Sequence, residues 1–261
     1  MRPFTIAQIS DVHCGSPYFV GSLLERAILE VNELGPDVVV VSGDLTNAGY
    51  QQEFEEAAAY LERIDCESMI VIPGNHDSRN VGYVHFEELF GDRSPEFHSN
   101  GVSIVAVDST EPDLDHGTIG RGNYKRIEES FARQAYLRIF VLHHHLLPIP
   151  GTGRERNIVY DAGDALECLQ RAQVNLVLSG HKHVPYAWRL ESIFVVNAGT
   201  VSTTRLRGKT KSCYNVIEAS PERVTVFRRY PFHERFALLS FDPRTLEYEK
   251  DRSLLGETAH G

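Results

Sequence analysis

The sequence predicts an α/β protein in which two mixed β-sheets pack face to face as a sandwich flanked by helices. Two observations support this fold class. Over the first two-thirds of the chain, short runs rich in Val, Ile and Leu alternate with segments of helical periodicity. Beyond Val184 the pattern changes to alternating runs joined by Gly, Pro and Ser turns. That pattern favours antiparallel strands that complete a second sheet.

Six strands are expected in the first part of the chain. Several are nearly continuous apolar runs, as expected for strands covered on both faces. They are Phe4–Ile9, Asp37–Ser42, Ser68–Ile72, Val102–Val107, Arg138–Leu142 and Asn175–Ser179. Three later strands are expected at Ile193–Val196, Cys213–Glu218 and Arg223–Arg229.

Four helices are expected between the early strands. The first, Gly21–Leu34, is amphipathic and stops at a Gly-Pro pair, which is a strong terminator. The second, Glu53–Ile64, places its apolar side chains on one face. The third and fourth are expected at Ile127–Leu137 and Asp164–Ala172.

Length and composition favour one large domain. The chain has 261 residues, 42% of them hydrophobic and 24% charged, which is ordinary for a globular protein with a sizeable core. We expect a single domain over residues 1–241 and a polar tail over residues 242–261. The formal charge of −10 does not favour non-specific binding to nucleic acid or anionic membranes. Nucleic acid therefore enters only as a candidate substrate.

The cysteines and the N-terminal residues favour a cytoplasmic location. The four cysteines are far apart and form no CxxC pair, which argues against a disulfide framework and a zinc–thiolate site. The N-terminal residues lack the apolar stretch of a signal peptide, and no segment approaches the length of a membrane span.

Polar clusters follow nearly every predicted strand. In open α/β sheets, ligands gather at the carboxyl ends of the strands, so residues far apart in sequence can converge there. Together the clusters supply enough Asp, Asn and His ligands for two metal ions side by side. They are Asp11-Val12-His13, Gly43-Asp44, Gly74-Asn75-His76-Asp77, His143-His144-His145, Gly180-His181-Lys182-His183 and Asn197-Ala198-Gly199-Thr200.

The first two clusters offer carboxylates to a metal site. In an extended backbone, Asp11 and His13 would point the same way and reach one ion. Gly43 permits a sharp turn that lets Asp44 face the strand ends. A carboxylate can bridge two cations, and Asp44 is expected to do so.

The third cluster is the most specific single motif. The amide oxygen of Asn75 is a neutral hard ligand that suits a divalent ion already facing carboxylates. The adjacent His76 would project toward substrate rather than metal. Asp77 can accept a hydrogen bond from an imidazole N–H or from the loop backbone.

The two histidine clusters complete the candidate ligand set. Three successive imidazoles cannot all face one point, so one or at most two of His143, His144 and His145 contribute. His181 and His183 have i, i+2 spacing. A lone histidine is more often structural, but five of the 12 histidines lie in two strand-end clusters. Imidazole, carboxylate and amide ligands without sulfur fit Mn, Fe, Zn or Co.

The order DxH, GD, GNHD, a His cluster and GHxH resembles the calcineurin-like metallophosphoesterases, over residues 4 to about 200. The compact size is similar to the branch that contains class III cyclic-nucleotide phosphodiesterases and glycerophosphodiesterases. The resemblance implies a four-layer sandwich, a binuclear metal centre and, in many relatives, a homodimer. It assigns Asp11, His13, Asp44 and His183 to one metal, and Asp44, Asn75, His143 and His181 to the second.

One motif departs from the family pattern of two histidines followed by proline. Here the chain reads His143-His144-His145-Leu146-Leu147-Pro148. The first His after the strand is normally the ligand, so His143 is assigned, with His144 as the alternative.

The implied function is phosphodiester hydrolysis. A metal-bound hydroxide would attack phosphorus in line, and His76, held by Asp77, would stabilise the oxyanion or protonate the leaving group. The expected substrate is a small phosphodiester, either a cyclic nucleotide or a glycerophosphodiester. A phosphomonoesterase or nuclease on the same centre is the first alternative. A non-catalytic interaction module is the second, which the intact ligand set opposes.

Two groups of basic residues are candidates for substrate contacts. Arg154 and Arg156 follow the His cluster and could bind a phosphate, although solvated loop arginines are an equally good interpretation. A basic patch could contact an extended anionic substrate or form a hairpin tip. It comprises Arg205, Arg207, Lys209 and Lys211.

Overall fold

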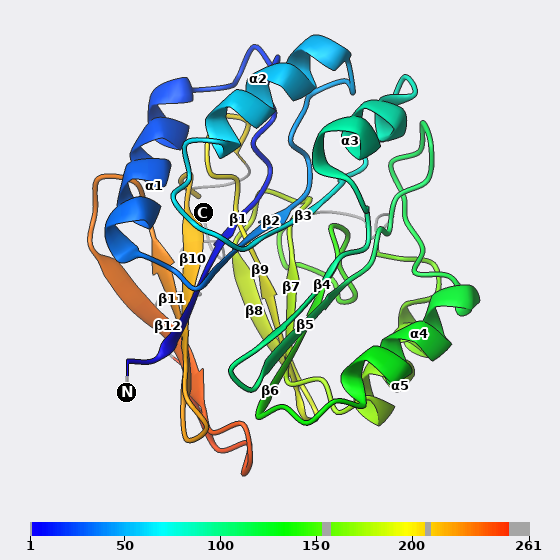
Figure 1. Cartoon of the computed structure of the whole chain (residues 1–261), viewed down its shortest axis with the longest axis vertical. Coiled ribbons are helices and arrows are strands. Elements are labelled where there is room, and N and C mark those ends of the chain that lie inside the picture. Colours follow the sequence, from blue (N-terminus) through cyan, green and yellow to red (C-terminus); the bar gives the residue numbers. More distant parts are fainter. Residues whose placement is uncertain (1, 153–157, 207–209, 251–261) are drawn as a thin grey trace.

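The computed structural model describes residues 2–152, 158–206 and 210–250, which form two β-sheets packed face to face with helices outside (Figure 1). The helices are α1 (Gly21–Leu34), α2 (Gln51–Leu61), α3 (Gly82–Phe90), α4 (Arg121–Phe131) and α5 (Ala162–Arg171). The strands are β1 (Phe4–Ile9), β2 (Val38–Ser42), β3 (Met69–Ile72), β4 (Glu96–Ser99), β5 (Val102–Ala106), β6 (Leu137–Val141), β7 (Leu176–Ser179), β8 (Tyr186–Leu190), β9 (Ile193–Asn197), β10 (Tyr214–Ala219), β11 (Val224–Arg229), β12 (Arg235–Phe241) and β13 (Tyr248–Lys250).

Both sheets are mixed, as predicted. The first sheet has the order β13-β12-β11-β10-β1-β2-β3, with β1, β2 and β3 parallel and β10 antiparallel to β1. The second has the order β4-β5-β6-β7-β9-β8, with antiparallel strands at its two edges. The parallel strands in each sheet carry their polar clusters at one end.

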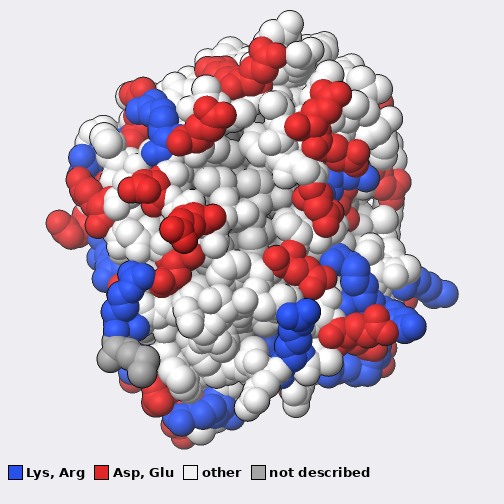
Figure 2. Space-filling view, in the orientation of Figure 1, with Lys and Arg blue, Asp and Glu red and all other residues white. Residues whose placement is uncertain are grey.

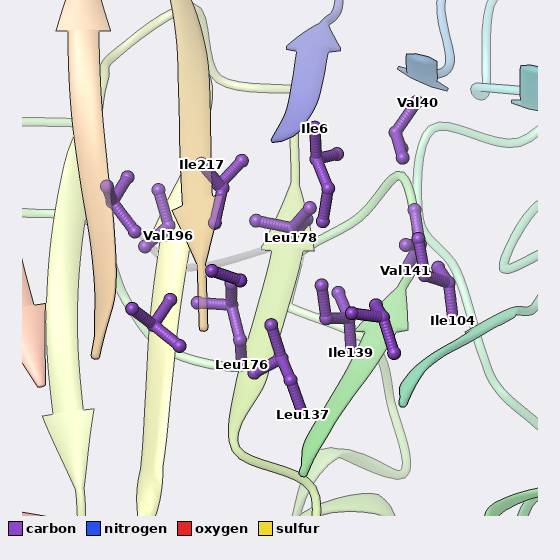
Figure 3. Close-up of a cluster of buried hydrophobic side chains, with 14 of the residues drawn as sticks. Ile6, Val40, Ile104, Leu137, Ile139, Val141, Leu176, Leu178, Val196 and Ile217 are labelled. Carbon is purple, nitrogen blue, oxygen red and sulfur yellow. The ribbon is translucent and has the colours of Figure 1, made fainter. Parts of the chain in front are cut away.

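The central core lies between the two sheets (Figure 3). Every second side chain of a strand points into this core. Examples are Ile6 and Val40 from the first sheet and Ile139 and Leu178 from the second, which are fully buried. The intervening residues face outward and are covered by α1, α2 and α3 on the first sheet and by α4 and α5 on the second (Figure 1). This arrangement explains the continuous apolar runs and confirms the four-layer sandwich.

The placement of the late strands corrects the sequence prediction. We expected the strands beyond Val184 to complete a second sheet, but only β8 and β9 join it. The strands β10 to β13 extend the first sheet instead, because β10 pairs with the edge of β1 that β2 leaves open.

Other differences concern local elements. The helix expected at Ile127–Leu137 is α4, which begins at Arg121 after Gly120, and Leu137 instead begins β6. The prediction omitted α3, β4, β8 and β12. In addition, β13 lies within the segment expected to be a polar tail and pairs with β12, so the sheet continues past residue 241. The single-domain organisation itself remains a prediction.

The exposed surface follows the acidic composition. Asp and Glu side chains are scattered among uncharged residues over the upper half of the face shown in Figure 2, and Lys and Arg gather mainly in its lower part. None of the helices in the described part of the chain has the length and apolarity needed to cross a membrane. All four cysteines are free thiols.

Candidate metal centre

All seven predicted ligands meet at the carboxyl ends of parallel strands from both sheets. Asp11 and His13 follow β1, Asp44 follows β2, and Asn75 follows β3. From the second sheet, His143 follows β6, while His181 and His183 follow β7. Their donor atoms form two adjacent groups.

The first group contains donor atoms of Asp11, His13, Asp44 and His183. His183 Nε2 lies 3.3 Å from Asp11 Oδ1 and 2.8 Å from His13 Nε2. His13 Nε2 lies 3.6 Å from Asp44 Oδ2. His183 Nδ1 donates to the carbonyl of Arg205, which aims Nε2 into the group.

The second group shares Asp44 with the first. Asp44 Oδ2 lies 3.4 Å from His143 Nε2. Asn75 Oδ1 lies 3.3 Å from His143 Nε2 and 2.8 Å from His181 Nδ1. One carboxylate oxygen therefore contacts both groups, as expected for a bridging ligand.

The convergence depends on left-handed backbone conformations. Asp11, His13, Asp44, His181 and His183 have φ between 53° and 78°, which is uncommon for residues other than glycine. The expectation that Asp11 and His13 align through an extended backbone is therefore wrong. Backbone strain of this kind clusters at functional sites, where the surrounding structure holds it in place.

Gly43 allows the β2 turn to approach its neighbours. Its φ is 92°, as expected for a sharp turn at glycine. A Cβ atom at this position would lie 2.5 Å from His143 Nδ1 and 2.8 Å from the amide nitrogen of Gly74. The space beside His143 therefore requires glycine.

The orientation of the His triplet favours His143 over His144 as the donor. His143 Nδ1 donates to the carbonyl of Ser42, 2.8 Å away, and its Nε2 faces Asp44 and Asn75. His144 Nδ1 faces the hydroxyl of Ser109 at 2.9 Å, and His144 has no ligand atom in the group that His143 forms with Asp44 and His181.

The predicted pairing of His76 with Asp77 is wrong. The Asp77 carboxylate accepts from the amides of Leu45, Thr46 and Gly74 and from the Thr46 hydroxyl. These bonds tie the loop after β3 to the loop after β2. Asp77 therefore accepts from the loop backbone, which was the alternative to accepting from an imidazole N–H. His76 Nδ1 contacts the carbonyl of Asn47 at 2.5 Å. Arg79 Nη1 also lies 3.1 Å from Nδ1, but the shorter contact is with a carbonyl, which only accepts, so Nδ1 carries the proton and Arg79 does not donate to it.

Burial and neighbouring charges set the protonation of the donors. Burial lowers the pKa of His13 to about 3. Burial also disfavours charge on His143, but the Asp44 carboxylate outweighs it and raises the pKa of His143 to about 9. Burial opposes ionisation of Asp44, yet His143 and His76 hold its pKa well below the usual range. Burial, and then Asp44, raise the pKa of Asp77 to about 6.

These donors fit divalent metal ions. Asp11 and Asp44 are buried, and the contacts described above place imidazole nitrogens and an amide oxygen beside them. The Nε2 atoms of His13 and His183 face each other at a distance where only one proton fits between them. Ionised carboxylates and neutral imidazoles are the forms that bind metals, so a bound cation would displace the proton that Asp44 favours on His143. The clustered His and Asp residues therefore form a candidate site for divalent metal ions.

The centre lies at the base of a cavity of about 360 Å³. Its lining includes three side chains that no sequence motif indicated as part of the site, namely Arg79, Asp115 and Lys182. Arg79 lies two residues after the GNHD motif, which is the only sequence signal for it. Arg205, from the predicted basic patch, also lines the cavity. Arg154, Arg156, Arg207 and Lys209 lie outside the described residues.

The last polar cluster, Asn197-Ala198-Gly199-Thr200, stabilises the backbone beside the centre through Thr200. The hydroxyl of Thr200 donates to the carbonyl of Asp11 at 2.7 Å and accepts from the amide of Thr203. It therefore fixes the turn that carries Asp11.

Fold and site together define a metal-dependent phosphoric ester hydrolase. The chain belongs to the calcineurin-like phosphoesterase family, whose model matches residues 4–185. This match confirms the family resemblance of the ordered motifs.

Known proteins similar to this chain include two named probable cyclic nucleotide phosphodiesterases. The protein from Xenorhabdus bovienii is 24% identical over 200 residues, covering 71% of this chain and 79% of the relative. The protein from Synechococcus is 28% identical over 192 residues, covering 69% and 73%. Among solved structures, a purple acid phosphatase from yellow lupin shares the fold, with a TM-score of 0.73 at 15% identity, over 91% of this chain and 53% of the other.

Proposed function

We propose that this protein is a phosphodiesterase that hydrolyses a small phosphodiester, a cyclic nucleotide or a glycerophosphodiester, at a binuclear metal centre. The observation that carries the proposal is the sharing of Asp44 Oδ2 between two groups of donor atoms. The names of the bacterial relatives support a diester substrate.

The proposed ligands follow the two groups. Asp11, His13, Asp44 and His183 would hold one metal ion, and Asp44, Asn75, His143 and His181 the other. The donor set fits Mn, Fe or Zn. Two bound metal ions would polarise the phosphoryl oxygens and lower the pKa of a bound water.

His76 is the proposed catalytic acid. It lines the cavity, and one of its nitrogens lies within 4.8 Å of donor atoms of His13 and Asp44. The Asn47 carbonyl occupies Nδ1, so Nε2 is the nitrogen available to the substrate. A protonated His76 would pass the Nε2 proton to the departing oxygen while Nδ1–H stays on Asn47. Asp77 contributes by holding the loop that carries His76.

A substrate panel with added Mn²⁺ tests the proposal. We expect bis(p-nitrophenyl) phosphate to be hydrolysed with a higher kcat/KM than p-nitrophenyl phosphate, and cyclic AMP or a glycerophosphodiester to be turned over. Preference for the monoester, or for single-stranded DNA, would favour the alternative esterases. A metal-loaded protein that hydrolyses none of them would favour an interaction module.

Replacement of His76 tests its role separately from metal binding. His76→Ala should lower kcat for the diester by about 10²–10⁴-fold, because it removes the proton donor. Its Mn²⁺ content should match wild type. The control is His233→Ala, an exposed histidine outside the cavity, which should keep wild-type rates. Wild-type hydrolysis by His76→Ala would refute the assignment.

A further inference from the structure

A fixed carboxylate lies on the rim of the cavity beside the second donor group. Asp115 Oδ1 accepts from Arg79 Nη2 at 2.5 Å and from Asn75 Nδ2 at 3.3 Å. Asp115 lines the cavity, and its side chain is 68% exposed, so its carboxylate is open to solvent there. Neither Arg79 nor Asp115 contributes a donor atom to either group.

The amide of Asn75 joins this carboxylate to the second donor group. Its Oδ1 faces His143 and His181, while its Nδ2 faces Asp115. The negative charge of Asp115 is therefore held one amide group away from the place where the phosphoryl group would bind. Arg79 is only 31% exposed on its side chain and holds the carboxylate from the other side.

The pair changes the charge balance that a substrate meets. A free arginine on the rim would attract a dianionic phosphate, but Asp115 offsets the charge of Arg79. A phosphomonoester brings a second negative charge to the cavity, whereas a phosphodiester has an uncharged ester oxygen in its place. A fixed carboxylate in this position therefore repels the monoester more strongly than the diester.

We propose that Asp115, held by Arg79 and Asn75, is a specificity-determining residue that disfavours dianionic phosphomonoesters and so selects monoanionic phosphodiesters. This inference rests on the proposed phosphoesterase function and identifies the substrate charge that the same site selects.

Removal of the charge tests the inference. The variant Asp115→Asn keeps the size of the side chain and should lower the ratio of kcat/KM for bis(p-nitrophenyl) phosphate to that for p-nitrophenyl phosphate about tenfold, mainly through a faster monoester reaction. Asp115→Glu retains the charge and should restore most of the wild-type ratio. The matched control is Glu111→Gln, which removes a charge from the same loop outside the cavity and should leave the ratio unchanged.

A binding measurement provides a second readout. Isothermal titration of the Mn²⁺-loaded proteins with inorganic phosphate at mildly alkaline pH should show about tenfold tighter binding to Asp115→Asn than to wild type. Binding of dimethyl phosphate, a monoanion, should change much less. Added salt should reduce the difference, since the carboxylate is solvent-exposed.

The outcomes separate this inference from the proposed function. If Asp115→Asn changes neither the diester-to-monoester ratio of kcat/KM nor the affinity for phosphate, the proposed role of Asp115 in substrate selection is wrong. An equal loss of both reactions, without tighter phosphate binding, also overturns it, because Asp115 would then only orient Asn75. If wild type hydrolyses neither ester but Asp115→Asn binds phosphate more tightly, Asp115 disfavours dianions as proposed. In that case it is the proposed phosphodiesterase function that fails.

Discussion

At the scale of single residues, the partner of one ring nitrogen decides what the other nitrogen can do. The Ser42 carbonyl occupies Nδ1 of His143, the Arg205 carbonyl occupies Nδ1 of His183, and the Asn47 carbonyl occupies Nδ1 of His76. In each case Nε2 is left facing the centre or the cavity. Backbone carbonyls thus fix the tautomers of these imidazoles.

This arrangement separates the two histidines that the sequence left as alternatives. His143→Ala should lose one of the two metal ions per chain, or bind it about 10–100-fold more weakly, because Nε2 of His143 faces Asp44 and Asn75. His144→Gln should keep wild-type metal content, since His144 has no ligand atom in the groups of donor atoms that include His143, Asp44 and His181. Metal analysis of dialysed, Mn²⁺-reconstituted protein measures both. The reverse pattern would assign the ligand to His144.

Residue identities in the centre were predictable, but their geometry was not. The Asp, Asn and His residues after strands appear in the sequence, and strand ends bring them together. The left-handed backbone at Asp11, His13 and His183 leaves no sequence signal. The contacts of Asp77 and Asp115 join residues far apart in the chain, so no local pattern reveals them.

At the scale of elements, one carboxylate joins the beginnings of two helices on the second sheet. Asp161, at the start of α5, accepts hydrogen bonds from the amides of Ile119 and Gly120 and from the hydroxyl of Tyr124. Burial would raise the pKa of Asp161, but these donors, together with the side chain of Thr118, outweigh it and hold the pKa below its usual range.

Loss of this carboxylate should destabilise the protein in a pH-dependent way. Asp161→Asn should lower the free energy of unfolding by about 1–2 kcal/mol at neutral pH, since a partly exposed charged acceptor is removed. A lowered folded-state pKa stabilises the protein above the unfolded-state value of about 3.9, and this contribution is lost as pH falls through the folded-state pKa. Denaturant titrations should therefore show a difference that shrinks in acid.

The control for this prediction lies on the same helix. Glu167→Gln removes an exposed carboxylate that pairs along α5 with Arg171, and it should change the free energy of unfolding little. Equal effects of the two substitutions at all pH values would contradict the role of Asp161.

Element prediction succeeded where the local signals were strong. The bounds of β1 and α1 match the expectation, because an apolar run and an amphipathic helix ending at Gly35 are unambiguous. Helix α3 was missed because it begins after Val81, in a left-handed conformation and without a side-chain cap.

At the scale of the whole molecule, the two sheets share one core. Ile104 and Ile139 from the second sheet pack in the same buried cluster as Ile6 and Val40 from the first (Figure 3). The proposed metal ligands also come from both sheets, so separation of the sheets would dismantle the candidate centre.

A shared core predicts a single cooperative unfolding transition for metal-free protein. Ile139→Ala should lower the free energy of unfolding by about 2–5 kcal/mol and shift the whole calorimetric transition, because Ile139 is fully buried between the sheets. Leu190→Ala, at a position 37% exposed, is the control and should cost much less. Two separable transitions would contradict the single-domain organisation.

The topology of the late strands could not be read from the sequence. Alternating runs predict antiparallel strands with one face buried, but they do not state which sheet edge a strand joins. That choice depends on the open edge of β1, which forms only when β2 occupies the other side.

Titration of metal content against diesterase activity tests the central claim most directly. Metal-free protein should be inactive, and hydrolysis of bis(p-nitrophenyl) phosphate should rise until two Mn²⁺ ions are bound per chain, because the two donor groups share Asp44. Full activity with one bound ion, or with none, would contradict the binuclear centre.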